Sequence, residues 1–248
     1  MSNLDHYKQA FGSVGWFIPP YVTVGFLSIL SKRIADNGHS LDQQELEAFL
    51  ALIYSADNVA AMVTERYPVT PYIQDYKKII SEAVQAHFTG LDHIAVSGLI
   101  PVIEGAGKKL ADDRSVSFVS IRSLFNNLAG DCKRDAIENK IGAVDGVVCM
   151  MDSFAEFAEK HLYVHSENYP LADKTNRHGI LHGAYSDHDY GRPLNFYKAI
   201  AAIDFLCFVS AFRAPISWFA PSPTDESKLL ATYYCTCALL GKNKPTFS

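Results

Sequence analysis

The sequence lacks several patterns that identify large classes of enzyme. It contains no GxxxxGK[ST] phosphate loop, no GxGxxG dinucleotide fingerprint and no GxSxG nucleophile elbow. Its five cysteines include no CxxC pair, so their spacing disfavours a dithiol redox centre and favours free thiols in a reducing compartment. Nothing in the sequence therefore predicts a cofactor.

Positive charge and long hydrophobic runs are also scarce. The chain has 22 Lys and Arg against 27 Asp and Glu, a net charge of −5, which excludes a protein that is basic throughout. The most apolar early stretch, 14–30, is interrupted by Gly15, Pro19, Pro20 and Gly25. The first residues also lack the basic and apolar regions of a signal peptide. We therefore expect a cytoplasmic protein that does not insert into a membrane.

What the sequence does have is globular composition and helical periodicity. Of its 248 residues, 48% are hydrophobic and 20% are charged, and no run alternates as a half-buried strand would. This pattern predicts an all-α fold. Ser40 with Gln43 resembles a capping box, and Thr224 is a candidate cap of the last helix. The expected helices span 40–66, 71–90, 91–113, 115–130, 131–162, 195–213 and 225–241, and the sixth of these is apolar nearly all round.

One short stretch, NRHGILHG at 176–183, concentrates ionisable and amide groups on a predicted short helix. His178 and His182 are four residues apart and share a helix face. Asn176 is a candidate N-cap, and Arg177 is long enough to reach the same end of a cleft as His182. Together with free amides of the first helical turn, these groups can converge on an anion.

Such a set of residues suits phosphodiester chemistry. His182 can act as a general acid or base near neutral pH, and Arg177 can bind a phosphate and stabilise charge in the transition state. RNA brings its own nucleophile, the 2′-hydroxyl, so the reaction does not require a metal. The products would be a 2′,3′-cyclic phosphate and a 5′-hydroxyl.

The pattern of Arg177 and His182, R-x4-H with a polar residue after the Arg, resembles the motif of HEPN domains. AHFTGLDHIAVSGLIPVIEG at 86–105 resembles the opening helical hairpin of many such domains. Together with GWFIPP near the start and NFYKAIAAIDFL after the motif, the chain is similar to a group of bacterial proteins of unknown function. HEPN domains are small helical bundles, and many are dimeric, metal-independent endoribonucleases in toxin–antitoxin, phage-defence and RNA-processing systems, whereas others bind nucleotides or proteins.

The resemblance implies specific roles. Arg177 and His182 would carry out catalysis, with Asn176 and His178 assisting, although many active members have Asn or Asp where this chain has His178. It also implies a homodimer in which two motif helices form one composite cleft, RNA or a nucleotide as ligand, and a possible antitoxin protein as partner. The similarity covers about 72–213 as a HEPN-like bundle. We expect 1–70 to be an N-terminal helical extension and 214–248 to contribute a helix that packs on the bundle.

Other interpretations of the same residues stay open. In a purely structural one, Asn176 caps the helix, Arg177 pairs with an acid such as Glu104, and His182 bonds a carbonyl; in the catalytic one, Glu104 orients the site instead. Tyr185 can either stack on a base or pack against other rings. A metal-dependent hydrolase would use His178, His182 and His188, but Gly179 occupies the place of the glutamate in the HExxH pattern.

Overall fold

The computed structural model of the protein describes residues 3–243, and over these residues it contains helices and no strand. The chain is 69% helical, which confirms the predicted all-α class. The α-helices are α1 (Asn3–Ser13), α2 (Val24–Asp36), α3 (Gln43–Ile53), α4 (Ala56–Ala61), α5 (Lys77–Phe88), α6 (Asp92–Asp113), α7 (Ile121–Glu138), α8 (Val144–Phe157), α9 (Arg177–Leu181), α10 (Pro193–Ser210) and α11 (Asp225–Lys242). Short π-helical turns at Met62–Arg66 and Ala158–Leu162, and 3₁₀ turns at Tyr67–Val69, Gln74–Tyr76 and Ser166–Asn168, connect them.

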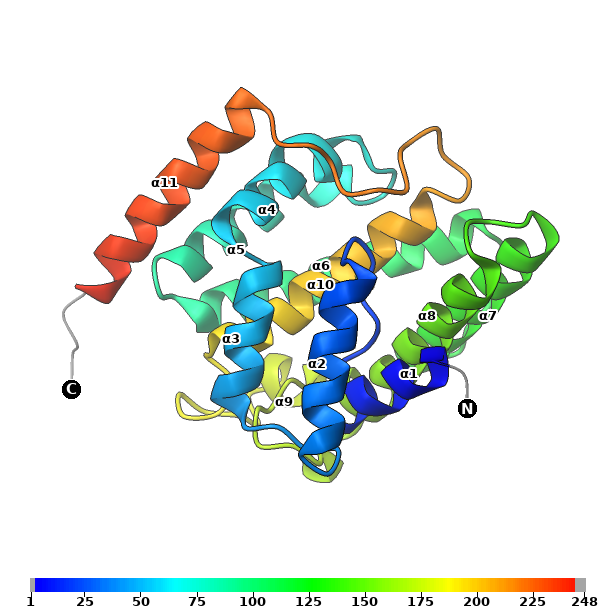
Figure 1. The fold of residues 1–248 in the computed structure, drawn as a ribbon, viewed down its shortest axis with the longest axis horizontal. Coiled ribbons are helices and arrows are strands. Elements are labelled where there is room, and N and C mark those ends of the chain that lie inside the picture. Colours follow the sequence, from blue (N-terminus) through cyan, green and yellow to red (C-terminus); the bar gives the residue numbers. More distant parts are fainter. Residues whose placement is uncertain (1–2, 244–248) are drawn as a thin grey trace.

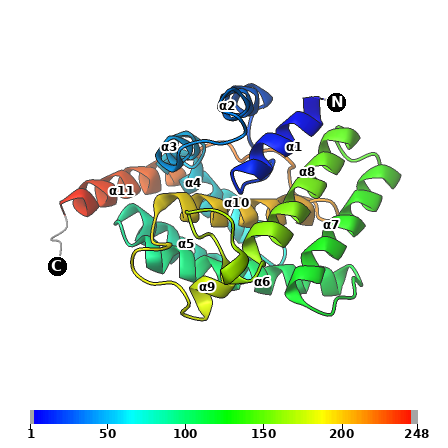
Figure 2. The same ribbon diagram turned by 90° about the horizontal axis from the view of Figure 1, so that it is seen from below.

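Helix α10 lies at the centre of the bundle. It runs between a layer that contains α1, α2 and α3 and a layer that contains α5 and α6 (Figure 2). Helices α7 and α8 pack at one end of the molecule and α11 lies at the other (Figure 1). Every residue of α10 from Leu194 to Ser210 is buried. Because this segment is apolar on nearly all sides, the sequence predicted a core helix, and the structure confirms it.

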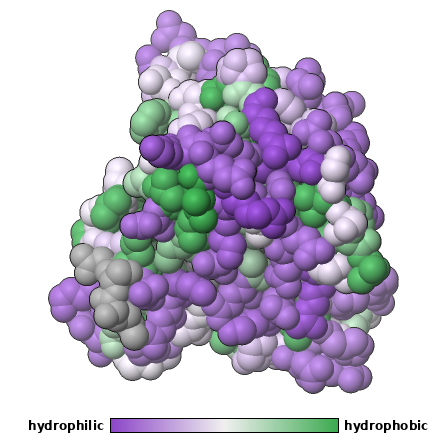
Figure 3. All heavy atoms as spheres, turned by 90° about the vertical axis from the view of Figure 1, so that its right-hand side faces the viewer, coloured by the Kyte–Doolittle hydropathy of each residue, from purple (hydrophilic) through white to green (hydrophobic). Residues whose placement is uncertain are grey.

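By length and composition alone, α10 could also cross a membrane. However, 94% of that window is buried inside the fold, as in the core helix of a soluble protein. A second candidate exists only if α3 and the segment from Ala56 to Val69 count as one span, and these are bent by 50°. The face of the molecule in Figure 3 is mostly hydrophilic, with apolar residues in separate patches.

One hydrophobic core runs from Tyr7 to Tyr234. Phe17, which comes before α2, is fully buried and its ring meets those of Phe154 and Phe205 at 5.1 and 6.2 Å between centroids. Helix α11 packs on α4 and α5. The predicted N-terminal extension therefore shares its core with the predicted bundle, and the domain boundaries at 70 and 213 stay predictions. The outermost residues of those segments, 1–2 and 244–248, lie outside the described part of the chain.

The single helix expected over 40–66 is wrong. Helix α3 ends at Ile53, and a new helix begins after Ser55, whose hydroxyl accepts a hydrogen bond from the amide of Asn58. The first cap is also different: the carboxylate of Asp42, and not Ser40, accepts bonds from the amides of the first turn. Both caps satisfy amides that have no partner inside their helix, and two caps define two helices.

The boundary expected between 130 and 131 is wrong as well. Helix α7 begins only at Ile121, after a capping box between Ser120 and Ser123, and continues through Gly130 to Glu138. The chain turns near Gly142, which has a φ of 58°. Glycine adopts this left-handed conformation without steric cost, whereas Gly130 stays helical. The single helix expected over 131–162 is therefore divided between α7 and α8.

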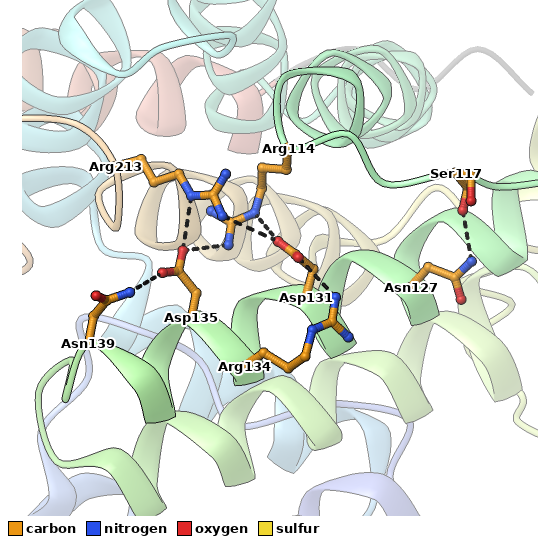
Figure 4. A network of polar contacts seen from close by, with 8 residues as sticks. All are labelled: Arg114, Ser117, Asn127, Asp131, Arg134, Asp135, Asn139 and Arg213. Carbon is orange, nitrogen blue, oxygen red and sulfur yellow. Dashed lines mark hydrogen bonds and ion pairs between the residues drawn. The ribbon is translucent and has the colours of Figure 1, made fainter.

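A network of charged side chains joins α6, α7 and the segment after α10 (Figure 4). Arg114 donates from Nε to Asp131 and from Nη2 to Asp135, both at 2.7 Å, and Arg213 donates to Asp135 at 3.1 Å. Burial alone would raise the pKa of Asp135, but the hydrogen bonds from the two arginines hold it below its ordinary value. These two arginines and two aspartates therefore connect the end of α6, helix α7 and the segment after α10.

Candidate functional site

The segment before α9 is held by a buried ion pair. Nζ of Lys198, on α10, lies 2.6 Å from the carboxylate of Asp173, and both side chains are 1% exposed. The Asp173 carboxylate also accepts hydrogen bonds from the hydroxyls of Tyr169 and Thr175, at 2.7 Å each. Burial opposes ionisation of Asp173, but the nearby Lys198 ammonium and these hydrogen bonds lower its pKa below the usual range. The loop is therefore fixed to the central helix.

Asn176 fixes the start of α9. Its Oδ1 accepts a hydrogen bond from the amide of Gly179 at 2.9 Å, which is the expected N-cap. Its Nδ2 donates to the carbonyls of His161 and Val164 at 3.0 and 2.7 Å. Asn176 is completely buried, so its role is to position the motif and not to touch a ligand directly. The bond to Gly179 also occupies an amide that the sequence suggested for anion binding, and that expectation is wrong for this amide.

Arg177 lies between an acid and an imidazole. Its Nε donates to Oε1 of Glu104, on α6, at 2.6 Å. Its Nη1 lies 2.6 Å from Nε2 of His182. The side chains of Arg177 and Glu104 are 20% and 13% exposed, so the pair is only partly screened by solvent. The sequence suggested each of these partners, and the structure brings all three side chains together.

The contact between Arg177 and His182 fixes the protonation of the imidazole. A guanidinium has no acceptor, so Arg177 must donate and Nε2 must accept. His182 is then neutral in this arrangement and carries its proton on Nδ1. The residue ends α9 as its C-cap and its side chain is exposed. A neutral imidazole is the form required of a general base, and here its Nε2 lone pair is engaged with Arg177 until a ligand takes the place of His182 on the guanidinium.

Three imidazoles form a row beside this contact. The ring of His178 lies 5.6 Å from that of His182 and 6.1 Å from that of His165, and both pairs are close to parallel. Burial lowers the pKa of His178, and the charge of Arg177 contributes to the same shift. His165 was not predicted, because it lies in a loop separated from the motif and no local pattern marks it.

Tyr185 packs on the motif. An added Cβ at Gly179 would lie 2.0 Å from the Tyr185 ring, so only glycine permits this approach. The ammonium of Lys174 lies 5.4 Å from the centre of the same ring. The ring is half-buried, and it supports α9 from one side. These contacts favour the packing role that the sequence left open.

His188 does not join the other histidines in a ligand set. Within residues 3–243, no group of three or more His, Cys, Asp or Glu side chains is arranged to hold a metal ion. The five cysteines are free thiols. The supporting residues that sequence reasoning missed are Asp173 and Lys198. A single lysine in an otherwise apolar helix was a signal for a buried ion pair, since a buried charge needs a partner.

Comparison with known proteins adds nothing to this geometry: no family model, no curated protein and no solved structure matches the chain. The resemblance to HEPN domains therefore rests on the pattern of residues in the motif and its surroundings alone.

Proposed function

We propose that the protein is a metal-independent endoribonuclease in which Arg177 and His182 act on one phosphodiester. The observation that carries the proposal is the contact between Nη1 of Arg177 and Nε2 of His182, at 2.6 Å on a partly exposed surface. A phosphate oxygen bound by Arg177 would lie within reach of the same imidazole. Glu104 orients Arg177 by a second hydrogen bond, so the guanidinium is positioned before any ligand binds.

In the proposed reaction, the bound phosphate takes the place of His182 on Nη1 of Arg177. The freed Nε2 of His182 takes the proton of the 2′-hydroxyl, and the 2′-oxygen attacks phosphorus. The bond from phosphorus to the 5′-oxygen breaks, and a proton from an imidazole acid completes the leaving 5′-hydroxyl. Arg177 stabilises the negative charge that grows on the phosphoryl oxygens. His178 is the nearest candidate for the acid, because its ring is the next in the row of imidazoles. Since the pKa of His178 is lowered, this step is favoured in mild acid, where His178 carries the proton. The other product is a 2′,3′-cyclic phosphate.

The proposal includes a homodimer. His182 is exposed at one end of a five-residue helix, so one protomer offers little surface to enclose an RNA strand. Two copies of α9 that face one another would supply two arginines and two rows of imidazoles to one cleft. A cytoplasmic location and a protein that inhibits the enzyme belong to the same proposal.

A second function is a HEPN-like module that binds a nucleotide or a protein without cleaving RNA. The ion pair between Glu104 and Arg177 favours this alternative, because the carboxylate offsets the charge that would attract a phosphate. The net charge of −5 also favours this alternative, because it disfavours binding of a polyanion such as RNA. In this case the motif would hold α9 against α6, and His182 would contact a ligand without accepting its proton.

The experiment is cleavage of a mixed RNA panel by the purified protein in EDTA. Wild-type protein should cut. His182→Ala should lose at least about a hundredfold in rate, the usual contribution of a general base, and Arg177→Ala should lose about as much because the charge on the phosphoryl oxygens is no longer stabilised. His188→Ala is the matched control, since His188 is an exposed histidine in the next loop. Circular dichroism and thermal melting establish that each variant folds.

Three results would overturn the nuclease proposal. A protein that cuts no RNA but binds a nucleotide would support the non-catalytic module. Cleavage that needs an added divalent ion would support a hydrolase built on the histidines. Cleavage by both folded variants at the wild-type rate would place the activity elsewhere or in a contaminant.

A further inference from the structure

A cavity of about 250 Å³ lies apart from the motif, and none of its lining residues belongs to 176–183. Its walls come from the start of α2, the segment that joins α3 to α4, the middle of α10 and the linker before α11. This linker, orange in Figure 1, crosses the molecule from the end of α10 to the start of α11. A cavity of about 150 Å³ is enough to hold benzene, so this one suits a molecule somewhat larger.

Aromatic and aliphatic side chains make most of the lining. Tyr21, Phe26, Tyr54 and Tyr67 contribute four rings from three separate segments of the chain. The exposed side chain of Leu52 and the linker proline Pro223 lie at the opening. Such a concave apolar site with a few convergent polar groups has the form of a small-molecule site.

A buried carboxyl group without a cation lies in this wall. Asp204 is 5% exposed and comes from the middle of α10. Its Oδ1 accepts a hydrogen bond from the Tyr67 hydroxyl at 2.8 Å, and among the described residues no hydrogen bond reaches Oδ2. Arg66 forms no ion pair with it, since both its terminal nitrogens donate to the carbonyls of Ser217 and Phe219. Buried charges are normally paired with an opposite charge, and the Asp204 carboxylate has no such partner.

Two hydroxyl groups in the same wall also lack partners. The oxygens of Tyr21 and Tyr54 are buried, and neither forms a hydrogen bond. The other polar side chains of the wall are engaged: Thr23 caps α2, and Asn58 donates to the carbonyl of Ile53 at 2.9 Å. Unpartnered buried polar groups are costly, and two such hydroxyls beside the free Oδ2 of Asp204 indicate a ligand that supplies hydrogen-bond donors.

The backbone conformation of Tyr21 is a further, independent indication of a binding site. Tyr21 has a φ of 64°, in the left-handed region that costs a non-glycine residue free energy. The Arg66 guanidinium lies 5.6 Å from the centre of its ring and also holds the linker through its two carbonyl contacts. Arg66 therefore keeps a strained wall residue and the linker in place around the cavity.

From this arrangement we infer that the cavity binds a small primary amine with an apolar body, its ammonium group placed against Asp204. The ammonium would supply three donors, enough for Oδ2 of Asp204 and the hydroxyls of Tyr21 and Tyr54. The rings of the wall would add cation–π attraction, and the apolar body would fill the remainder. A carboxylic acid of the same size would meet a like charge and be excluded.

The test uses three probes of one shape: phenethylamine, 2-phenylethanol and phenylacetate. Calorimetric titration of the full chain at pH 8 should give binding of the amine, at least about tenfold weaker binding of the alcohol, and none of the acid; tenfold corresponds to about 1.4 kcal/mol. Asp204→Asn should remove the preference for the amine, whereas Asp75→Asn, an exposed carboxylate elsewhere, should leave it unchanged.

A second variant tests the location. Val59→Phe would place a larger side chain in the wall and should weaken binding of amine and alcohol alike. Three outcomes overturn the inference: no binding of the amine at millimolar concentration, equal binding of amine and alcohol, or amine binding that survives both Asp204→Asn and Val59→Phe. Equal binding would assign the cavity to neutral apolar molecules. None of these results bears on RNA cleavage by Arg177 and His182.

Discussion

Nη1 of Arg177 lies 2.6 Å from Nε2 of His182, while Nε of the same guanidinium lies 2.6 Å from Glu104. One side chain thus connects an acid on α6 with an imidazole at the end of α9. A ligand that takes the place of His182 on Arg177 would free the Nε2 lone pair that this contact occupies. The arrangement also makes Glu104 a positioning residue, since it acts on the reaction only through Arg177.

Glu104→Gln tests this positioning. The amide oxygen still accepts a hydrogen bond from Arg177, but the charge is lost, so the free energy of unfolding should fall by about 1–2 kcal/mol. The RNA cleavage rate should fall about tenfold, less than for Arg177→Ala. This corresponds to a loss of about 1.4 kcal/mol of transition-state stabilisation. Chemical denaturation and cleavage assays measure the two effects. Glu82→Gln, in an exposed pair with Lys78, should change neither; an unchanged rate in Glu104→Gln would argue against a positioning role.

Lys198→Met tests the buried anchor of the motif. The substitution leaves the ionised Asp173 carboxylate buried without its cation, and such a loss typically costs about 3–5 kcal/mol. The matched control is Lys133→Met, whose pair with Asp152 has side chains 33% and 37% exposed, and exposed pairs contribute at most about 1 kcal/mol. Urea denaturation at pH 7 compares them. Equal losses in the two variants would contradict the importance assigned to the Lys198 contact.

The buried His161 should make the protein less stable in mild acid. Burial, followed by the charge of Lys198, lowers the pKa of His161 to about 4. Between about pH 6.5 and 4 the unfolded chain therefore binds a proton that the folded chain does not, so stability falls as the pH falls, by up to about 3 kcal/mol. His161→Gln should show a smaller decline over this window, whereas His188→Gln should follow the wild type. Denaturation curves at several pH values give the slopes, and a parallel decline in His161→Gln would refute the assignment.

Asp204 should change the stability of the protein with pH in the opposite direction. Burial raises its pKa to about 7, against the smaller effects of the Tyr67 hydrogen bond and the Arg66 charge. Between about pH 4 and 7 the unfolded chain releases a proton that the folded chain keeps, so this group destabilises the fold increasingly as the pH rises, by up to about 4 kcal/mol. Asp204→Asn should become more stable than the wild type across this window. An advantage that does not grow with pH would contradict the buried acid.

The windows of His161 and Asp204 overlap, so their effects partly cancel in the wild type between about pH 4 and 6.5. The two single variants separate them. A flat pH profile for the wild-type protein is therefore compatible with both assignments, and only the differences between each variant and the wild type are informative.

Local patterns predicted the features that depend on local physics. The apolarity of α10 predicted a buried central helix, and Thr224 caps α11 as expected. The break at Ser55 was missed although Ser55 is a good cap, because the hydrophobic spacing continues through it. The turn near Gly142, in place of one at Gly130, was also missed, because a glycine in a sequence is compatible with a helical position as well as with a turn.

In the candidate site, too, the residues of one local stretch were predicted and most contacts between distant segments were not. Arg177, His178 and His182 were found because they lie within one short stretch, and Glu104 was suggested as a partner from a separate helix. His165 and the cavity around Asp204 were missed, since they depend on contacts between segments far apart in the sequence. The roles of Arg177 and His182 in catalysis stay predictions, because the geometry is equally suited to binding.

The most direct test of the nuclease is the chemistry of its product ends. RNA is incubated in EDTA with wild-type protein or with His182→Ala, beside the same RNA carrying 2′-deoxynucleotides at the cut positions. We predict fragments that end in 2′,3′-cyclic phosphate and begin with 5′-hydroxyl, no cutting of the deoxy substrate, and no cutting by the variant. Fragments with 5′-phosphate ends, or cleavage of the deoxy substrate, would contradict attack by the 2′-hydroxyl and with it the proposed role of His182.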